Sequence, residues 1–235
     1  MSKLSIQLER TAYAMIVLAA VIQLASPFLI RQLGYDGFHA RMWIEAFPNV
    51  MRAGIWYPHW LPDAFGGLGS STFYFYPPLA FFIIAPLRLL LTGVSPTAIY
   101  HIFGLIMTLA SILSMRYFLS VLNTRRILAW FGSLLYGFSP YHFDVLYVRS
   151  GPAEHLAFVW APLVFAGIFL LLREDRPARG FLLFAISWGL LLLSHVPAAV
   201  TIGIGGLAIV ISSFRSLTWP RFGLIALATL LGTTL

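Results

Sequence analysis

The chain has 235 residues, of which 60% are hydrophobic and 10% are charged, and its mean hydropathy is +0.86. A soluble domain carries about 25% charged residues, so this composition excludes an ordinary soluble fold and predicts an all-α polytopic membrane protein. The net charge of +7 does not indicate nucleic-acid binding, because basic residues gather in the cytoplasmic loops of membrane proteins. Since the chain has no cysteine, disulfides and thiolate metal sites are also excluded.

The first apolar run, 12–30, follows the basic residues Lys3 and Arg10 and has no clear signal-peptide cleavage site. We therefore expect an uncleaved first membrane-spanning helix and a cytoplasmic N-terminus. The run 77–91 differs, because it is short, begins with two prolines and carries Arg88. These features indicate a helix that lies at the membrane surface or re-enters it, rather than a full span.

If 77–91 does not span, the positive-inside rule is satisfied along the whole chain. If it spans, the clusters Arg125–Arg126 and Arg173–Arg179 fall on the wrong side. The first interpretation makes 31–97 and 141–154 external loops. The expected spans are 12–30, 98–121, 127–140, 155–172, 180–195, 197–214 and the run from 222 onward.

The external loop 31–97 is predicted to contain short helices that lie on the membrane. One helix is expected to start at Asp36, to be interrupted and restarted at Pro48, and to stop at Gly54. The aromatic strings 56–60 and 73–76 are typical of anchors at a bilayer interface. Residues 1–235 form one transmembrane domain in this interpretation. Because the chain ends inside an apolar run, we expect it to be the N-terminal part of a longer protein.

Asp36 and Glu154 are the leading candidates for chemistry. The chain has only 8 acidic residues, and the predicted topology places these two on the outer side. A carboxylate there suits a general base or a ligand of a divalent cation such as Mg²⁺ or Mn²⁺. The structural alternatives are a helix cap for Asp36 and a favourable position in the first turn of a helix for Glu154.

Basic residues near the two acids are candidates for binding a substrate phosphate. Arg149 can hold phosphate oxygens with paired hydrogen bonds, or it can simply pair with a neighbouring acid. The remaining candidates are His39, Arg41, His155 and His195. The structural alternative for each of them is a solvated or satisfied polar side chain near a helix end.

The order of these motifs resembles the GT-C superfamily of membrane glycosyltransferases, and in particular a branch labelled "6-pyruvoyl-tetrahydropterin synthase-related membrane protein". The resemblance covers roughly residues 10–200. Nothing in the chain resembles a soluble zinc-binding pterin enzyme, so the pterin label has no support in the residues. The strings that carry the resemblance are Asp36, Gly54–Trp60, Phe75–Leu79 and Arg149–Glu154.

The resemblance implies a helical bundle with interfacial jaw helices in the first external loop. It also implies inverting transfer of a sugar from a polyprenyl-phosphate donor to a glycan, lipid or protein acceptor, at the outer face of the cell membrane. Asp36 would deprotonate or orient the acceptor, and Arg149, with Arg41 or His39, would stabilise the departing phosphate. Neither Asp36 nor Glu154 has the neighbouring acid found in several GT-C families, which puts metal dependence in question.

Two functions of other classes compete with this one. A transporter or flippase of lipid-linked sugars would use the same polar residues as a path, and a non-catalytic scaffold would use them only for folding. A transporter is expected to place ionisable residues near the middle of the bilayer. The acids of this chain cluster at the predicted outer surface, which favours an enzyme.

Overall fold

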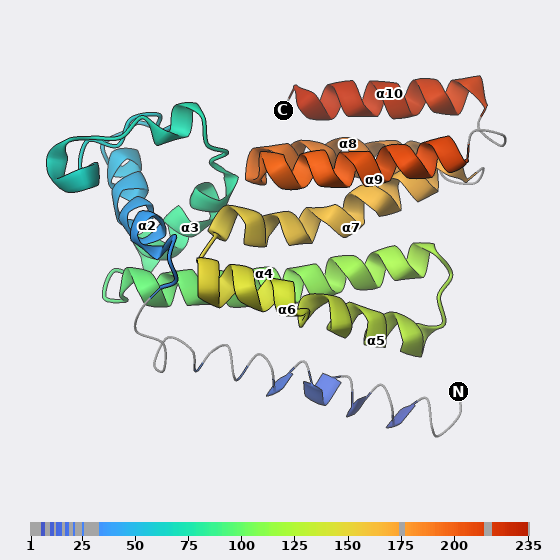
Figure 1. The fold of residues 1–235 in the computed structure, drawn as a ribbon, viewed down its shortest axis with the longest axis horizontal. Coiled ribbons are helices and arrows are strands. Elements are labelled where there is room, and N and C mark those ends of the chain that lie inside the picture. The colour runs from blue at the N-terminus through green and yellow to red at the C-terminus, as the bar shows by residue number, and fades with distance from the viewer. Residues whose placement is uncertain are drawn as a thin grey trace.

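The computed structural model describes residues 33–173, 177–213 and 218–234, together with scattered residues between 6 and 25. The described residues are mostly helical (Figure 1). Their extended pairing is limited to one isolated antiparallel bridge between Leu61 and Ser70. The predicted all-α fold class is confirmed in this coarse form.

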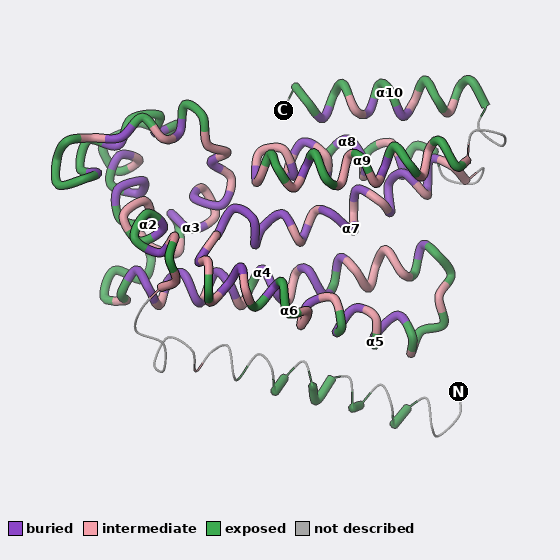
Figure 2. Tube along the Cα trace, in the orientation of Figure 1, coloured by how far each residue is buried: buried purple, intermediate pink, exposed green. Residues whose placement is uncertain are grey.

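Three helices of the described part are long and apolar enough to cross a membrane. They are α4 (Pro96–Val121), α7 (Pro152–Leu172) and α8 (Pro177–Ser194). The helix α7 packs against α4 and against α8, and it is buried along most of its length (Figure 2). It is the central helix of the bundle.

The remaining bundle helices, with 12 to 17 residues each, are shorter than these three. The expected spans 127–140, 197–214 and 222 onward correspond to α5 (Arg126–Gly137), α9 (Val196–Ser212) and α10 (Trp219–Thr233). At about 1.5 Å per residue, the 12 residues of α5 extend for about 18 Å, less than the roughly 30 Å of a bilayer core. Most of the predicted span 12–30 lies outside the described residues.

A head region, residues 33–95, packs on one end of the bundle (Figure 1). It contains α2 (Gly37–Arg52), the short turns Ala64–Gly67 and Thr72–Tyr74, and α3 (Leu79–Leu90). With 12 residues, α3 is too short to span a bilayer alone, as expected for the run 77–91.

Aromatic rings from α2, α3 and the loop between them fill the core of the head region. Phe47 lies 4.9 Å from Phe73 and 6.0 Å from Phe81 between ring centroids. The expected break at Pro48 is wrong, because α2 runs through this proline as one helix. Pro48 is buried on the same face as Phe47, and we infer that this packing offsets the lost backbone hydrogen bond.

The connection between α5 and α7 is short and tightly held. It contains one helical turn, α6 (Pro140–Phe143), and a π-helical turn, Asp144–Arg149. The hydroxyl of Tyr100 on α4 donates to the carbonyl of Leu146 at 3.0 Å, which fixes the π-helical turn on the bundle. Ser150 then adopts a left-handed conformation with φ 63°, and the chain turns into α7.

His142 in this connection predicts a pH dependence of stability. Its ring stacks on Phe158 at 3.9 Å, and burial lowers its pKa to about 4. Between pH 6.5 and about 4 the unfolded chain therefore binds a proton that the folded chain does not. Folding stability falls as the pH falls through this window, by roughly 3 kcal/mol in total.

Thermal unfolding in detergent from about pH 7.5 to about pH 4.5 measures this effect. The variant His142→Phe should show a smaller loss of unfolding temperature at low pH than the wild-type chain. An unchanged slope in the variant would show that His142 does not carry the effect.

Candidate active site

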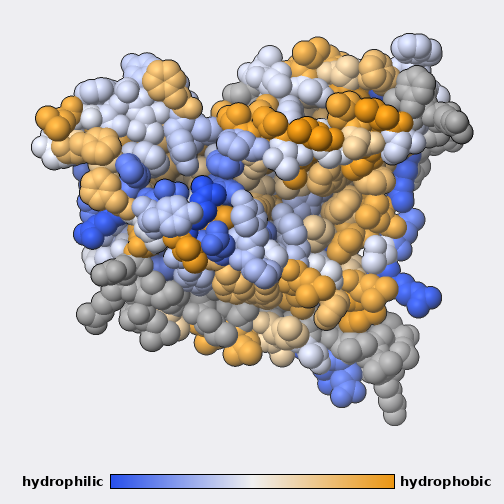
Figure 3. Space-filling model, viewed as in Figure 1, coloured by the Kyte–Doolittle hydropathy of each residue, from blue (hydrophilic) through white to orange (hydrophobic). Residues whose placement is uncertain are grey.

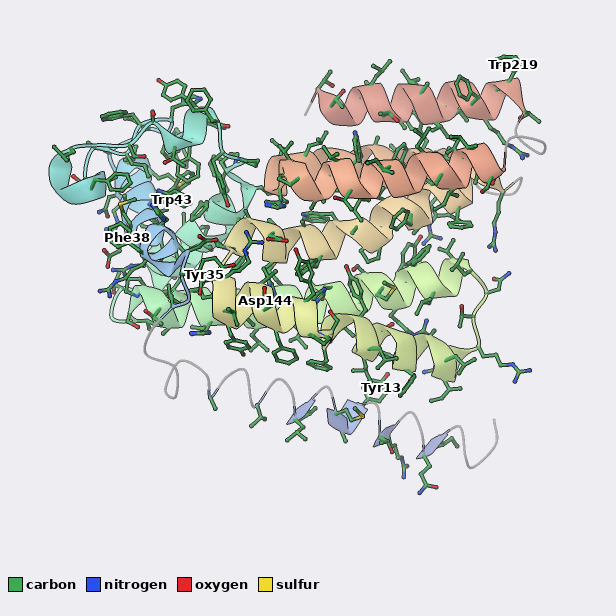
Figure 4. The ribbon with its side chains drawn as sticks, viewed as in Figure 1. Tyr13, Tyr35, Phe38, Trp43, Asp144 and Trp219 are labelled. Carbon is green, nitrogen blue, oxygen red and sulfur yellow. The ribbon has the colours of Figure 1, made fainter. Side chains whose placement is uncertain are left out.

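Two segments distant in sequence, 34–36 and 148–150, lie side by side. The amide of Asp36 donates to the carbonyl of Arg149 at 2.9 Å, and the preceding amide makes an equivalent bond at 3.1 Å. Gly34 permits this approach, because a Cβ atom there would lie 1.8 Å from a carbonyl oxygen of the facing segment. Figure 4 labels Tyr35 at the start of α2, close to the turn that begins at Asp144.

The guanidinium of Arg149 lies between two carboxylates. Its Nη2 atom is 3.7 Å from Asp36 Oδ2, and its Nη1 atom donates a hydrogen bond to Glu154 Oε2. The hydroxyl of Tyr141 donates to the other oxygen of Glu154. The side chain of Glu154 is 8% exposed and that of Asp36 is 47% exposed. Glu154 is therefore fully engaged, whereas Asp36 is accessible to a substrate.

A cavity of about 200 Å³ opens beside this ion-pair cluster. The head region and the bundle both contribute to its wall, and Figure 3 shows hydrophilic side chains gathered at this junction, next to hydrophobic helix surface. The polar side chains that line it include Asp36, His39, Tyr76, Arg149, Ser150, Glu154 and His195.

His195 connects the cavity to the start of α9. Its Nδ1 atom accepts a hydrogen bond from the amide of Ala198 at 3.3 Å, so the neutral ring carries its proton on Nε2. Burial lowers the pKa of His195 below its usual value, and the charge of Glu154 partly opposes this shift. At neutral pH the ring is therefore uncharged and offers an Nε2–H donor.

A second hollow, of about 330 Å³, adjoins the cavity and shares Glu154 and His195 with it. It lies between α7 and α9, and its wall is mostly apolar. Its other lining residues include Tyr136, Phe158, Ala161, Ala198 and Ile202. One site thus joins charged groups at the end of the bundle to an apolar surface along the helices.

Arg41 and His155, expected as substrate-binding residues, do not lie at this cavity. Arg41 is two residues after His39, roughly 200° further around α2, and lines a different hollow. His155 is buried between α4 and α7, where its Nε2 atom is 3.1 Å from Thr108 Oγ1. The capping alternative for Asp36 also fails, because its side chain makes no cap hydrogen bond.

Three aromatic residues of the site were not predicted from the sequence. Tyr141 orients Glu154, and Trp43 and Tyr76 line the cavity. Burial raises the pKa of Tyr76 to about 12, so its hydroxyl keeps its proton and can donate. The string 73–76 suggested membrane anchors, and only the packing of the head region reveals that Tyr76 faces inward.

The donor set does not fit a divalent cation. Within the described residues, no group of three or more Asp, Glu, His or Cys side chains converges. The two acids proposed as ligands of Mg²⁺ or Mn²⁺ are Asp36 and Glu154, and the guanidinium of Arg149 already lies between them. A second cation at this place would be repelled by Arg149.

The buried carboxylate of Glu154 predicts the effect of removing its partner. The variant Arg149→Met should lower the free energy of unfolding by about 1–3 kcal/mol, because it leaves Glu154 without its cation. The double variant Arg149→Met/Glu154→Gln should recover most of this loss. The control is Arg52→Met, since Arg52 is exposed on α2 and contacts Asn49. Equal losses in the single and double variants, measured by thermal unfolding, would contradict the account.

Comparison of the chain with known protein families, with curated proteins and with solved structures found no match.

Proposed function

We propose that this protein is a membrane glycosyltransferase of the GT-C type. It transfers a sugar from a polyprenyl-phosphate donor to an acceptor at the outer face of the cell membrane. One observation carries the proposal: a polar cavity with an accessible acid and an arginine adjoins an apolar hollow along the helices. A lipid-linked sugar phosphate has the same two parts, a charged head and a long hydrocarbon chain.

The donor phosphate is expected to lie between Arg149 and His195. Arg149 is held by its hydrogen bond to Glu154, so its remaining donors are already oriented when substrate arrives. His195 adds its Nε2–H. The hydrocarbon chain would follow the hollow between α7 and α9, and α7 is one of the helices long enough to cross a membrane.

Asp36 is the proposed general base. It takes the proton of an acceptor hydroxyl, and the hydroxyl oxygen attacks the anomeric carbon from the face opposite the phosphate. The bond from that carbon to the phosphate oxygen breaks, and its electron pair leaves with the phosphate beside Arg149. The configuration at the anomeric carbon is inverted. The exposure of Asp36 and its single long contact with Arg149, at 3.7 Å, support this role.

Asp36→Asn tests the assignment of the base. Transfer from a synthetic polyprenyl-phosphate hexose or pentose, in membranes that contain the protein, should fall by roughly 10²–10⁴-fold. The unfolding temperature should change little, because the carboxylate caps no helix. The control is Asp144→Asn, an acid of the neighbouring turn that lies outside the cavity wall. Full activity of Asp36→Asn would exclude the proposed chemistry.

Ala198→Trp tests the hollow as the place of the hydrocarbon chain. The indole fills space that Ala198 lines on α9, so KM for a long-chain donor should rise roughly tenfold with little change in kcat. A donor with a short isoprenoid chain should be used as well as before. The control is Ile204→Trp, since Ile204 is exposed on the same helix. Equal effects on both donors would argue against this path.

A further inference from the structure

The head region carries a groove that is separate from the cavity of the proposed reaction. Two hollows, of about 390 and 400 Å³, meet at Asn49 and Asp63. Each has the size of a small-ligand site. They lie along α2 and the loop that follows it, and none of their lining residues lines the active-site cavity.

One wall of the groove carries side chains that donate hydrogen bonds and side chains that accept them. Arg41, Glu45 and Asn49 are spaced four residues apart and therefore form one stripe along α2. Asp63 faces them from the loop, and all four residues are exposed. Carboxylates, an amide and a guanidinium together can both accept from and donate to neighbouring hydroxyls. A second guanidinium, that of Arg52, donates to Asn49 at 3.4 Å, so two carboxylates and two guanidinium groups balance and a neutral ligand is favoured.

The other walls of the groove present aromatic rings. Phe65, which is 43% exposed, borders the first hollow. In the second hollow the ring of His59 lies 4.3 Å from Tyr57 and 4.8 Å from Tyr74, and Trp60 is half exposed beside them. Flat apolar rings next to hydrogen-bonding groups suit the two chemical faces of a sugar.

Phe65 has a backbone conformation that its side chain does not favour. Its φ of 52° is left-handed, and it precedes Gly66 and Gly67, which have φ of 68° and 93°. A glycine would adopt this conformation without strain. Strained residues of this kind cluster at functional sites. The turn therefore carries backbone strain at the residue whose ring borders the groove.

We propose that this groove binds a neutral oligosaccharide. A lipid headgroup layer is the rival occupant, because exposed aromatic rings also suit a bilayer interface. The stripe of Arg41, Glu45 and Asn49, with Asp63 opposite, favours a ligand with many hydroxyls over an apolar one. This binding proposal does not depend on the proposed glycosyl transfer.

The groove leads toward the active site. The ring of Phe65 lies 6.1 Å from that of His39 and 6.4 Å from that of Phe38. His39 lines the cavity that contains Asp36. An oligosaccharide in the groove can therefore present one end past these rings to Asp36. Its identification as the sugar acceptor rests on the proposed function.

Saturation-transfer NMR on the full chain in lipid nanodiscs tests the binding. The probes are the tetrasaccharides mannotetraose, cellotetraose and chitotetraose, and at least one should receive magnetisation from the protein. Phe65→Gly should weaken that binding at least tenfold without lowering the unfolding temperature, because glycine suits the turn. Asp63→Asn should also weaken it. The control is Ile204→Trp, at a position exposed on α9 away from the groove, which should bind sugar as the wild-type chain does.

Three results would overturn the proposal. The first is that none of the tetrasaccharides binds the wild-type chain. The second is that Phe65→Gly binds as well as the wild type. The third is that, in nanodiscs, the ring of Phe65 exchanges magnetisation with the lipid headgroups and not with the sugar. If the sugar binds but no transfer is ever detected, the proposed function alone fails. If transfer occurs normally in Phe65→Gly although its sugar binding is weakened, only the identification of the groove sugar as the acceptor fails.

Discussion

The hydrogen bond between the guanidinium of Arg149 and the buried carboxylate of Glu154 is the interaction on which the site depends. Glu154 belongs to the first turn of α7, the central helix of the bundle. A carboxylate so little exposed is costly unless it is paired. Because Arg149 supplies the pairing and its own backbone carbonyl accepts from the amide of Asp36, this residue links the head region and the π-helical turn to the bundle.

The unequal surroundings of the two acids separate their proposed roles. Glu154 accepts hydrogen bonds on both oxygens, from Arg149 and Tyr141, and we infer that it holds the arginine in place. Asp36 remains accessible and meets Arg149 only at 3.7 Å. The surface of the site is also divided in two. The polar cavity at the end of the bundle adjoins the mostly apolar hollow between α7 and α9.

Much of this arrangement could be predicted from the sequence, because apolar runs define helices and charges define their ends. The expected spans 98–121 and 155–172 correspond closely to α4 and α7. The direction of each side chain could not be predicted. His155 follows Glu154 directly but points roughly 100° away, into the interface with α4. His39 and Arg41 likewise lie on opposite faces of α2. The environment of each side chain depends on which neighbouring helix packs against its face, and tertiary contacts determine that packing.

The absence of cysteine from the chain allows the central claim to be measured directly, by labelling single cysteines with a membrane-impermeant thiol reagent on intact cells. Suitable exposed positions are Tyr35 and Val148 beside the site, and Asn123 and Trp219 at the other end of the bundle. With the site at the outer face, Tyr35 and Val148 should be labelled, and Asn123 and Trp219 should be protected. Labelling at only one of the first two would separate Asp36 from Arg149, and labelling only at the second pair would place the site in the cytoplasm; either result would contradict the account.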